Sequence, residues 1–122
     1  MSIQLQIEQM PGYLAARLIG SGTLEEALQQ IELVAEHCKH TNNDKLLIDT
    51  TRYEVDVKIS LVDRFWVAER LGVFACYGIK VAYITKPERM DPRKFGVMVA
   101  QNRGVNVDAF TDFQTAEEWL LR

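Results

Sequence analysis

Hydrophobic and polar positions alternate at the start of the chain. In "IQLQIEQ", Ile3, Leu5 and Ile7 share one face of an extended segment, and polar side chains occupy the other. This period of two predicts a half-buried β-strand. A second apolar segment, "YLAARLIG", follows the turn signal "MPG", so the two segments are predicted to form an antiparallel hairpin. The glycines of "GSG", residues 20–22, are expected to end the second strand.

The pattern changes to a helical period after this hairpin. Thr23, followed three residues later by Glu26, forms the capping-box signature of a helix start. Apolar residues then recur with the helical repeat at Leu24, Ala27, Leu28, Ile31, Val34, Ala35 and Cys38. The first helix is therefore predicted to begin at residue 24, with one face toward the protein interior.

Three further apolar segments, "KLLIDT", "IKVAYIT" and "VNVDAF", alternate with predicted helices. Short apolar runs of this kind are typical of buried parallel strands. The predicted helices run from Ser60 to about Tyr77, from Asp91 and Pro92 to Arg103, and from Thr111 or Asp112 to the closing residues. In the last helix Ala116, Trp119 and Leu120 share a face, which predicts that Trp119 is largely buried against the sheet.

The predicted order of elements is β-β-α-β-α-β-α-β-α. Strands that alternate with helices after an initial hairpin indicate an α/β fold, with a mostly parallel mixed sheet and helices packed on it. No linker or internal repeat interrupts the pattern, so residues 1–122 are expected to form a single domain.

Composition argues against several classes of function. The chain has 122 residues, of which 48% are hydrophobic and 25% are charged, and its net charge is −3. No basic cluster suits a phosphate backbone, so nucleic-acid binding is not expected. No apolar run is long enough to cross a membrane and no targeting segment is recognised, so a cytoplasmic protein is expected. Cys38 and Cys76 occupy apolar helix positions and are expected to be reduced and buried.

The closing segment carries a resemblance to a known family. In "AFTDFQTAEEWLL", a phenylalanine, a polar cap and a short helix with a tryptophan follow the last strand. Together with "KLLIDTTRY", in which Asp49 ends the third strand, this segment resembles the SpoIIAA-like proteins, a STAS-related group. The resemblance spans nearly the whole chain, and it implies a sheet of four or five strands with helices packed on it.

The resemblance also implies a kind of function. STAS domains act as regulatory or protein-interaction modules, so a non-enzymatic role is expected. The fold also resembles the CRAL-TRIO lipid-binding fold, which leaves a lipophilic ligand as an alternative. STAS switches carry a phosphorylated serine in a D-S-[ST]-G motif, but this chain has "DTTRYEVDVKIS" before its second helix. Phosphorylation of Ser60, at the start of that helix, is therefore not expected.

Candidate ligand-binding residues gather where the predicted parallel strands end. Ligands of open α/β sheets bind at the carboxyl ends of the strands. The residues found there are Asp49, Thr50, Thr51, Arg52, Thr85, Lys86 and Arg89. They could bind an anion near helix N-termini, or they could instead satisfy backbone groups of loops and caps. A carboxylate at Asp49 is costly without a partner, and Arg52 or Arg89 could form a structural pair with it.

Other motifs do not indicate catalysis or metal binding. His37 and His40 stand three residues apart near a helix end, but no third ligand occurs at a matching spacing. "GSGT" lacks the spacing of a phosphate-binding loop, and neither a nucleophile elbow nor a positioned carboxylate pair is evident. No catalytic residue, metal ion or cofactor is therefore expected.

The second predicted helix, in "RFWVAERLGVFACYG", has more apolar residues than one buried face needs. The face predicted to pack on the sheet consists of Leu61, Phe65, Ala68, Gly72, Ala75 and Cys76. The candidate contact surface consists of Trp66, Val67, Arg70, Phe74 and Tyr77. These five side chains could contact a partner or line an adjacent pocket, or the helix could be buried on all sides.

Two functional hypotheses follow from these patterns. The first is a non-enzymatic regulatory or protein-interaction module that uses the second helix as its contact surface and forms a homodimer. The alternative is a protein that binds a small lipophilic or anionic molecule between the second helix and the carboxyl ends of the parallel strands.

Overall fold

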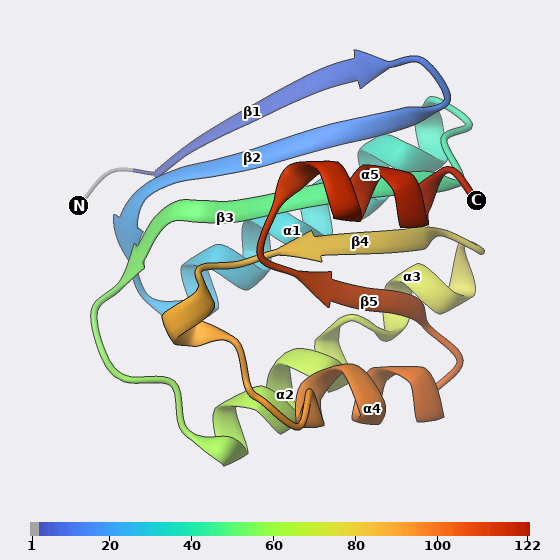
Figure 1. Cartoon of the computed structure of the whole chain (residues 1–122). Helices are drawn as coiled ribbons and strands as arrows, with labels where there is room; N and C mark the ends of the chain where they lie inside the picture. The colour runs from blue at the N-terminus through green and yellow to red at the C-terminus, as the bar shows by residue number, and fades with distance from the viewer. Residues whose placement is uncertain (1–2) are drawn as a thin grey trace.

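The strands form one sheet whose spatial order is the same as their order in the chain. The computed structural model describes residues 3–122 (Figure 1). The strands are β1 (Ile3–Met10), β2 (Tyr13–Gly22), β3 (Lys45–Val55), β4 (Lys80–Ile84) and β5 (Asn106–Phe110). β1 pairs antiparallel with β2, whereas the other neighbouring strands are parallel. The predicted α/β fold with a mostly parallel mixed sheet is therefore confirmed.

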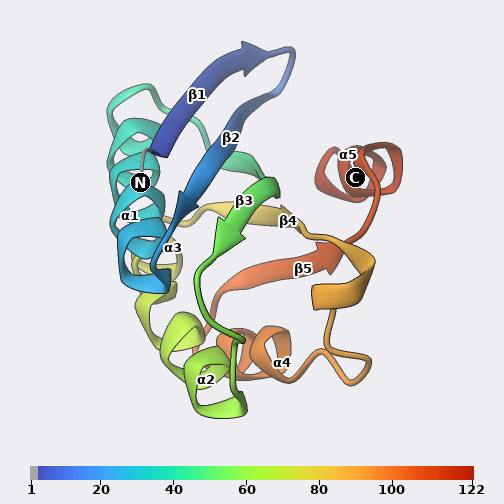
Figure 2. The same cartoon turned by 90° about the vertical axis from the view of Figure 1, so that its left-hand side faces the viewer.

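Helices cover the two faces of this sheet unequally. They are α1 (Leu24–His40), α2 (Leu61–Arg70), α3 (Gly72–Cys76), α4 (Phe95–Asn102) and α5 (Phe113–Leu120), with a short 3₁₀-helix, η1 (Pro87–Arg89). α1 to α4 lie on one face, and α5 lies on the other (Figure 2). Each parallel connection steps to the next strand in the same direction. Because such connections are right-handed in nearly all proteins, their helices must share a face.

Each face of the sheet has its own apolar cluster. The larger cluster lies between the sheet and α1 to α4, and Phe74 and Val81 are among its most buried members. The smaller cluster lies under α5 and includes Tyr13 and Leu120. The two largest apolar clusters therefore lie on opposite sides of a single sheet, and Leu18, Ala27 and Tyr53 form a third, smaller cluster.

β2 and β3 both extend further than predicted. β2 continues through "GSG" to Gly22, and β3 continues to Val55 beside it, so the predicted strand ends were wrong. The pairing register shifts between Arg17 and Ile19, which marks a bulge in this pair of strands. A Cβ atom at Gly22 would lie 2.6 Å from Tyr53 Oη, so this strand end needs a glycine at the close approach.

The helix predicted from Ser60 to Tyr77 is divided into α2 and α3. Leu71 joins the two helices, and Gly72, a weak helix former, follows it at the break. Ala68 is buried as predicted, but Leu61 is 61% exposed and Phe65 is 36% exposed, although both were expected to face the sheet. The inner face of α2 is therefore rotated from the predicted one.

The two cysteines lie in different environments. Cys38 on α1 is buried as predicted, and burial raises the pKa of its thiol to about 11. Its thiol is therefore protonated at neutral pH, as suits a core residue. Cys76 is exposed at the end of α3, contrary to the prediction that it is buried.

Aspartate side chains order the chain at the starts of α4 and α5. The Asp91 carboxylate accepts hydrogen bonds from the N–H groups of Arg93 at 3.2 Å and Phe95 at 2.8 Å. It therefore organises the turn before α4, which begins at Phe95 and not at Pro92 as predicted. Asp112, one of the two predicted caps of α5, accepts the Thr115 N–H at 2.9 Å.

Trp119 is only partly buried, so its predicted deep burial is not found. Its ring centroid lies 5.6 Å from that of Phe110, and Lys80 Nζ lies 4.5 Å from the same indole centroid. Lys80 also donates a hydrogen bond to the Trp119 carbonyl oxygen at 2.8 Å. Ala116 and Leu120, both fully buried, fill the core beneath α5.

Candidate functional site

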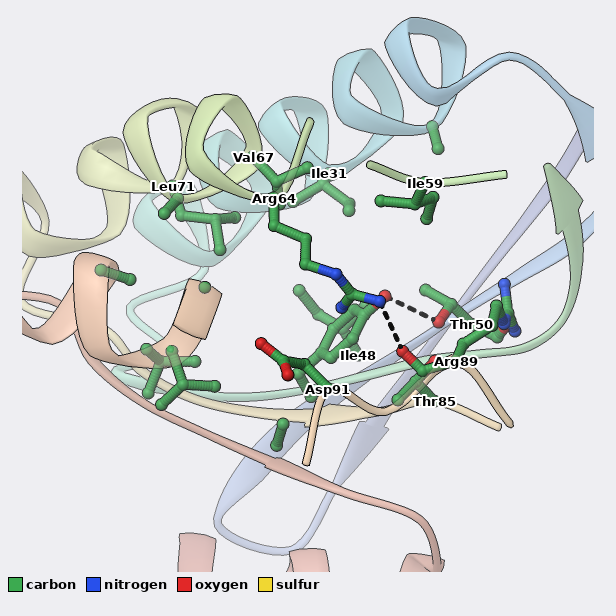
Figure 3. A pocket seen from close by; sticks show the side chains of 18 of the residues that line it. Ile31, Ile48, Thr50, Ile59, Arg64, Val67, Leu71, Thr85, Arg89 and Asp91 are labelled. Atoms are coloured by element: carbon green, nitrogen blue, oxygen red, sulfur yellow. Dashed lines mark hydrogen bonds between the residues drawn. The ribbon is translucent and has the colours of Figure 1, made fainter. Parts of the chain in front are cut away.

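A cavity lies between α2 and the carboxyl ends of the parallel strands. Its volume is about 150 Å³. Residues of α1, α2 and α4 line it on one side, and residues of β3, β4 and β5 form its floor (Figure 3). Its apolar lining includes Leu28, Ile31, Ile48, Ile59, Val67 and Leu71. The cavity is therefore mostly apolar, with polar groups gathered near the ends of β3 and β4.

Three of the predicted ligand-binding residues line this cavity, namely Thr50, Thr85 and Arg89. Thr50 Oγ1 lies 3.1 Å from both Tyr83 Oη and the Ile84 carbonyl oxygen. Arg89 donates to the carbonyl oxygens of Tyr53 at 2.9 Å and Thr50 at 2.7 Å. Its Nε is buried and has no hydrogen-bond partner among the described residues. Arg89 thus joins the loop after β4 to β3 and leaves one donor unused.

Asp49 and Thr51 do not line the cavity. Successive residues of a strand face opposite sides of a sheet, so Asp49 points away from the cavity that Thr50 lines. The Asp49 carboxylate accepts hydrogen bonds from the Thr51 amide at 2.9 Å and from the Thr51 hydroxyl at 2.7 Å. It pairs with neither Arg52 nor Arg89 within the described chain, so the suggested structural ion pair was wrong.

The two remaining candidates also lie outside the cavity. Arg52 is exposed to solvent. Lys86 forms an ion pair with Glu54, which lies near the end of β3. The predicted group is therefore divided into residues that line the cavity and residues that lie outside it, and within residues 49–52 the bulge and the pleat of β3 cause this division.

Arg64 of α2 is a cavity residue that the sequence analysis missed. Its side chain extends from the helix across the cavity toward the loop after β4 (Figure 3). One Nη2–H donates to the Arg89 carbonyl oxygen at 3.3 Å. The signal was present in the sequence, since Arg64, Val67, Ala68 and Leu71 have the i, i+3, i+4, i+7 spacing of a helix face. An arginine in an apolar stripe of this kind indicates a charged side chain directed toward the interior.

Asp91 supplies a carboxylate to the cavity wall. Hydrogen bonds from the Phe95 and Arg93 amides hold its pKa below the usual range, and the nearby positive charges of Arg64 and Arg93 act in the same direction. Asp91 is therefore ionised at neutral pH. Lys94, beside it, forms an ion pair with Asp108 at 2.8 Å.

The predicted contact surface of the second helix is divided by the break at Leu71. Trp66 is 59% exposed, as a contact residue should be. Val67 instead lines the cavity. Phe74, on α3, is fully buried in the main core, so the prediction that it lies at an exposed interface was wrong.

Arg70 and Tyr77 are engaged with α1. Arg70 donates to Glu25 at 2.8 and 3.0 Å and to Glu32 at 2.6 and 3.2 Å, and these hydrogen bonds raise its pKa. The Tyr77 hydroxyl donates to the Glu36 carboxylate, which raises the pKa of the phenol. Both side chains therefore hold α2 and α3 against α1, and their polar groups are already occupied.

The exposed apolar side chains of α2 form a different surface from the predicted one. We call Leu61, Val62, Phe65 and Trp66 the outer face of α2. Their exposed fractions are 61%, 64%, 36% and 59%. Leu61, Val62 and Phe65 border a shallow hollow together with Phe95 of α4. The second predicted helix thus has an exposed apolar surface, but this surface lies on a different side of α2 from the predicted one.

Ser60 caps α2. Its hydroxyl oxygen accepts the Asp63 N–H at 3.1 Å, and the Asp63 carboxylate accepts the Ser60 N–H at 2.9 Å. This reciprocal pair is a capping box, and it lowers the pKa of Asp63. The hydroxyl of Ser60 therefore has a structural use at the helix start.

The polar side chains that line the cavity are hydroxyl, guanidinium, ammonium and carboxylate groups. No histidine, cysteine or serine occurs among the described residues that line it. In residues 3–122, no group of three or more His, Cys, Asp or Glu side chains is arranged to hold a metal ion. No helix in the described part of the chain has the length and apolar character needed to span a bilayer.

Comparisons with known proteins agree with this fold. No protein-family model matches the chain, and no curated protein matches it. The chain is similar to an uncharacterized DUF3478-family protein with a SpoIIAA-like fold from Shewanella loihica, with 25% identity, a TM-score of 0.56, and coverage of 97% of this chain and 93% of that one.

A second solved structure extends the comparison. It is an anti-sigma factor antagonist from Mycobacterium paratuberculosis, with 11% identity, a TM-score of 0.62, and coverage of 99% of this chain and 96% of that one. In its fold the chain is therefore a SpoIIAA/STAS-like domain, as the resemblance of its closing segment implies.

Proposed function

We propose that this chain is a non-enzymatic regulatory module of the STAS type that contacts a protein partner through the outer face of α2. The observation that carries the proposal is the exposure of four adjacent apolar side chains, Leu61, Val62, Phe65 and Trp66. Apolar patches of this kind on a small domain are typical of interaction sites. The aromatic pair Phe65 and Trp66, whose ring centroids lie 6.1 Å apart, would supply the central contacts.

The surroundings of this face also resemble an interface. The Arg103 guanidinium lies 5.1 Å from the Phe65 ring centroid and forms an ion pair with Glu69. Interfaces combine aromatic and arginine residues with a polar rim in this way. The mycobacterial neighbour is named for its action on another protein, which supports a protein partner for a chain of the same fold.

We take a second copy of the chain as the partner to test first, because symmetric homodimers are the commonest soluble assemblies. Sedimentation velocity should show dimers whose fraction rises with protein concentration. Trp66→Glu should give monomers at every concentration, with unchanged far-UV circular dichroism. A glutamate there places a charge in the centre of the proposed contact.

Leu33 provides the matched control for this experiment. It is 59% exposed, like Trp66, but lies on α1. Leu33→Glu should therefore leave the dimer intact. A wild-type chain that sediments as a monomer at high concentration would contradict self-association, and equal effects of the two variants would contradict a contact at α2.

A second candidate function is binding of a small molecule, and the cavity beneath α2 favours it. Ligand sites are concave and mostly apolar, with a few polar groups that fix orientation. The cavity has this character, because Thr50, Thr85 and Arg64 stand at one end of an apolar space. Native mass spectrometry of the purified chain tests the idea, since a co-purified molecule should appear as a mass adduct that denaturation removes.

A further inference from the structure

The guanidinium of Arg64 is an incompletely used donor inside the cavity. Arginine carries five N–H donors and keeps its charge at all ordinary pH values. The side chain of Arg64 makes one hydrogen bond, to the Arg89 carbonyl oxygen at 3.3 Å. Within residues 3–122 no carboxylate lies within ion-pair distance of it. Most of its donors therefore have no protein acceptor.

The setting of Arg64 makes this unusual. Its neighbours in the cavity wall are largely aliphatic, including Ile31, Val67 and Leu71 (Figure 3). A charge placed among apolar groups is costly unless it is paired. Arg89 Nε, in the same cavity, is buried and has no partner among the described residues, whereas the unused N–H groups of the half-buried Arg64 are reached by solvent. Two guanidinium groups with unused N–H donors in one cavity favour an anionic guest.

The charges around the cavity restrict that guest to a single negative charge. Asp91 faces the cavity, but the Phe95 and Arg93 amides occupy its carboxylate. Its negative charge opposes a second one on a ligand. Lys94 is already paired with Asp108. A monocarboxylate suits this balance better than a phosphate dianion, because a carboxylate also matches the fork of a guanidinium.

The volume of the cavity restricts the size of the apolar part. The cavity measures about 150 Å³. An engineered protein cavity of roughly this volume accepts one benzene molecule. We propose, building on the second candidate function, that the cavity binds a small apolar monocarboxylate, with its carboxylate on Arg64 and a single ring or short branched chain among the aliphatic residues.

The test compares an acid with its neutral analogue. We would titrate the wild-type chain at pH 7 with 3-phenylpropanoate and with 3-phenylpropanol by isothermal calorimetry and ligand-observed NMR. The acid should bind at least about tenfold more tightly than the alcohol, the difference expected for one charge-assisted hydrogen-bonded pair. Arg64→Gln should remove this preference, and Arg64→Lys should restore part of it.

Two further variants make the result specific. Arg52→Gln is the charge-matched control, because Arg52 is exposed and does not line the cavity. It should leave the preference for the acid unchanged. Val67→Phe should fill the cavity from α2 and abolish binding of both compounds, with circular dichroism confirming that the chain is folded.

The possible outcomes separate this inference from the function on which it rests. If acid and alcohol bind equally and Val67→Phe blocks both, the cavity is a ligand site but the anionic class is wrong. If neither compound binds at millimolar concentration, the proposed ligand class is contradicted. If, in addition, native mass spectrometry finds no adduct, the small-molecule function is contradicted as well.

Discussion

The two faces of the sheet are closed in different ways. On one side, α5 places the fully buried Leu120 on the sheet, and the Tyr13 hydroxyl donates to the Glu117 carboxylate. On the other side, α2 buries Ala68 deeply but leaves an empty space between itself and the strands. The ion pairs that link α2 to α1, such as Arg70 with Glu25, are partly exposed to solvent.

This difference gives the domain one face that mainly contributes to stability and another that can rearrange more easily. A closed apolar contact contributes several kcal/mol, whereas an exposed ion pair contributes about 0–1 kcal/mol. α5 is therefore anchored by closed apolar packing, whereas α2 combines apolar packing against α4 with ion pairs to α1. Regions with fewer buried contacts open more readily, and binding sites are drawn from such regions. Both proposed functions place their contacts on α2.

A leucine-to-alanine substitution on each face of the sheet is the strongest test of the difference in packing. Leu120→Ala should lower the free energy of unfolding by about 2–5 kcal/mol, because it empties a closed core. Leu71→Ala, at the partly exposed wall of the cavity, should cost about 1 kcal/mol, since its site is already incompletely packed. Urea unfolding measures both, and equal losses would show that the two faces are packed equally well.

Alanine substitutions at two glycines should change the stability by smaller amounts, and in opposite directions. Gly22→Ala should lose about 1–3 kcal/mol, because its Cβ would meet the buried Tyr53 hydroxyl. Gly96→Ala, on α4 beside the cavity, should gain about 0.5–1 kcal/mol, because alanine favours the helix. Its Cβ would lie 3.6 Å from the Arg64 carbonyl oxygen, an ordinary contact. A loss at Gly96 would indicate that the cavity wall has no spare room.

The cap of α2 should contribute a smaller amount. Ser60→Ala should lower stability by about 1 kcal/mol, and Ser60→Asp should be nearly neutral, because aspartate caps a helix as well as serine does. Thermal unfolding of the three proteins measures the difference. Mass spectrometry of the protein purified from cells is the complementary experiment, since stoichiometric phosphate on Ser60 would contradict the expectation that this site is not phosphorylated.

The smallest expected effect concerns the pH dependence of the α5 cap. Hydrogen bonds from the Thr115 amide and hydroxyl lower the pKa of Asp112 in the folded chain. The stabilisation is therefore present above the unfolded-state pKa, about 3.9, and is lost as the pH falls through the lower folded value. Asp112→Asn, which caps without titrating, should show a smaller fall in urea midpoint between neutral and acid pH than the wild type.

Asp56→Asn serves as the control for this measurement. Its side chain accepts no hydrogen bond in the described part of the structure, so the change should leave the pH profile of the wild type in place. An Asp112→Asn profile identical to that of the wild type would show that the cap does not contribute through its charge.

The sequence patterns predicted the sheet well because the spacing of apolar residues in a strand depends directly on which of its faces are buried. Ile3 and Leu5 are half-buried and the apolar runs of the central strands are largely buried, as predicted, whereas Ile7, predicted to share the face of Ile3 and Leu5, is 38% exposed. The pattern of residues 61–77 is compatible with two different buried faces, because apolar side chains are frequent on more than one side of the helix. In the structure the helix breaks at Leu71, and Phe74, beyond the break, is buried in the main core.

The candidate site was predicted only in part for a related reason. Thr50, Thr85 and Arg89 were found because strand ends have a known geometry. Arg64 was missed because the wrong stripe of the helix was assigned to the interior. The cavity itself arises from the spacing between α2, α4 and the sheet, and no local pattern in the sequence encodes that spacing.

The identity of strand order and chain order also bears on the folding pathway. Each strand after β1 pairs with the strand that precedes it in the sequence, so a single connecting segment separates every pair of neighbouring strands. The chain therefore forms its sheet without joining distant segments, which keeps contact order low for a parallel topology and favours rapid folding. Such an order allows strands to be added one at a time to a growing nucleus, and α5, the last helix in the chain, packs on β3, β4 and β5.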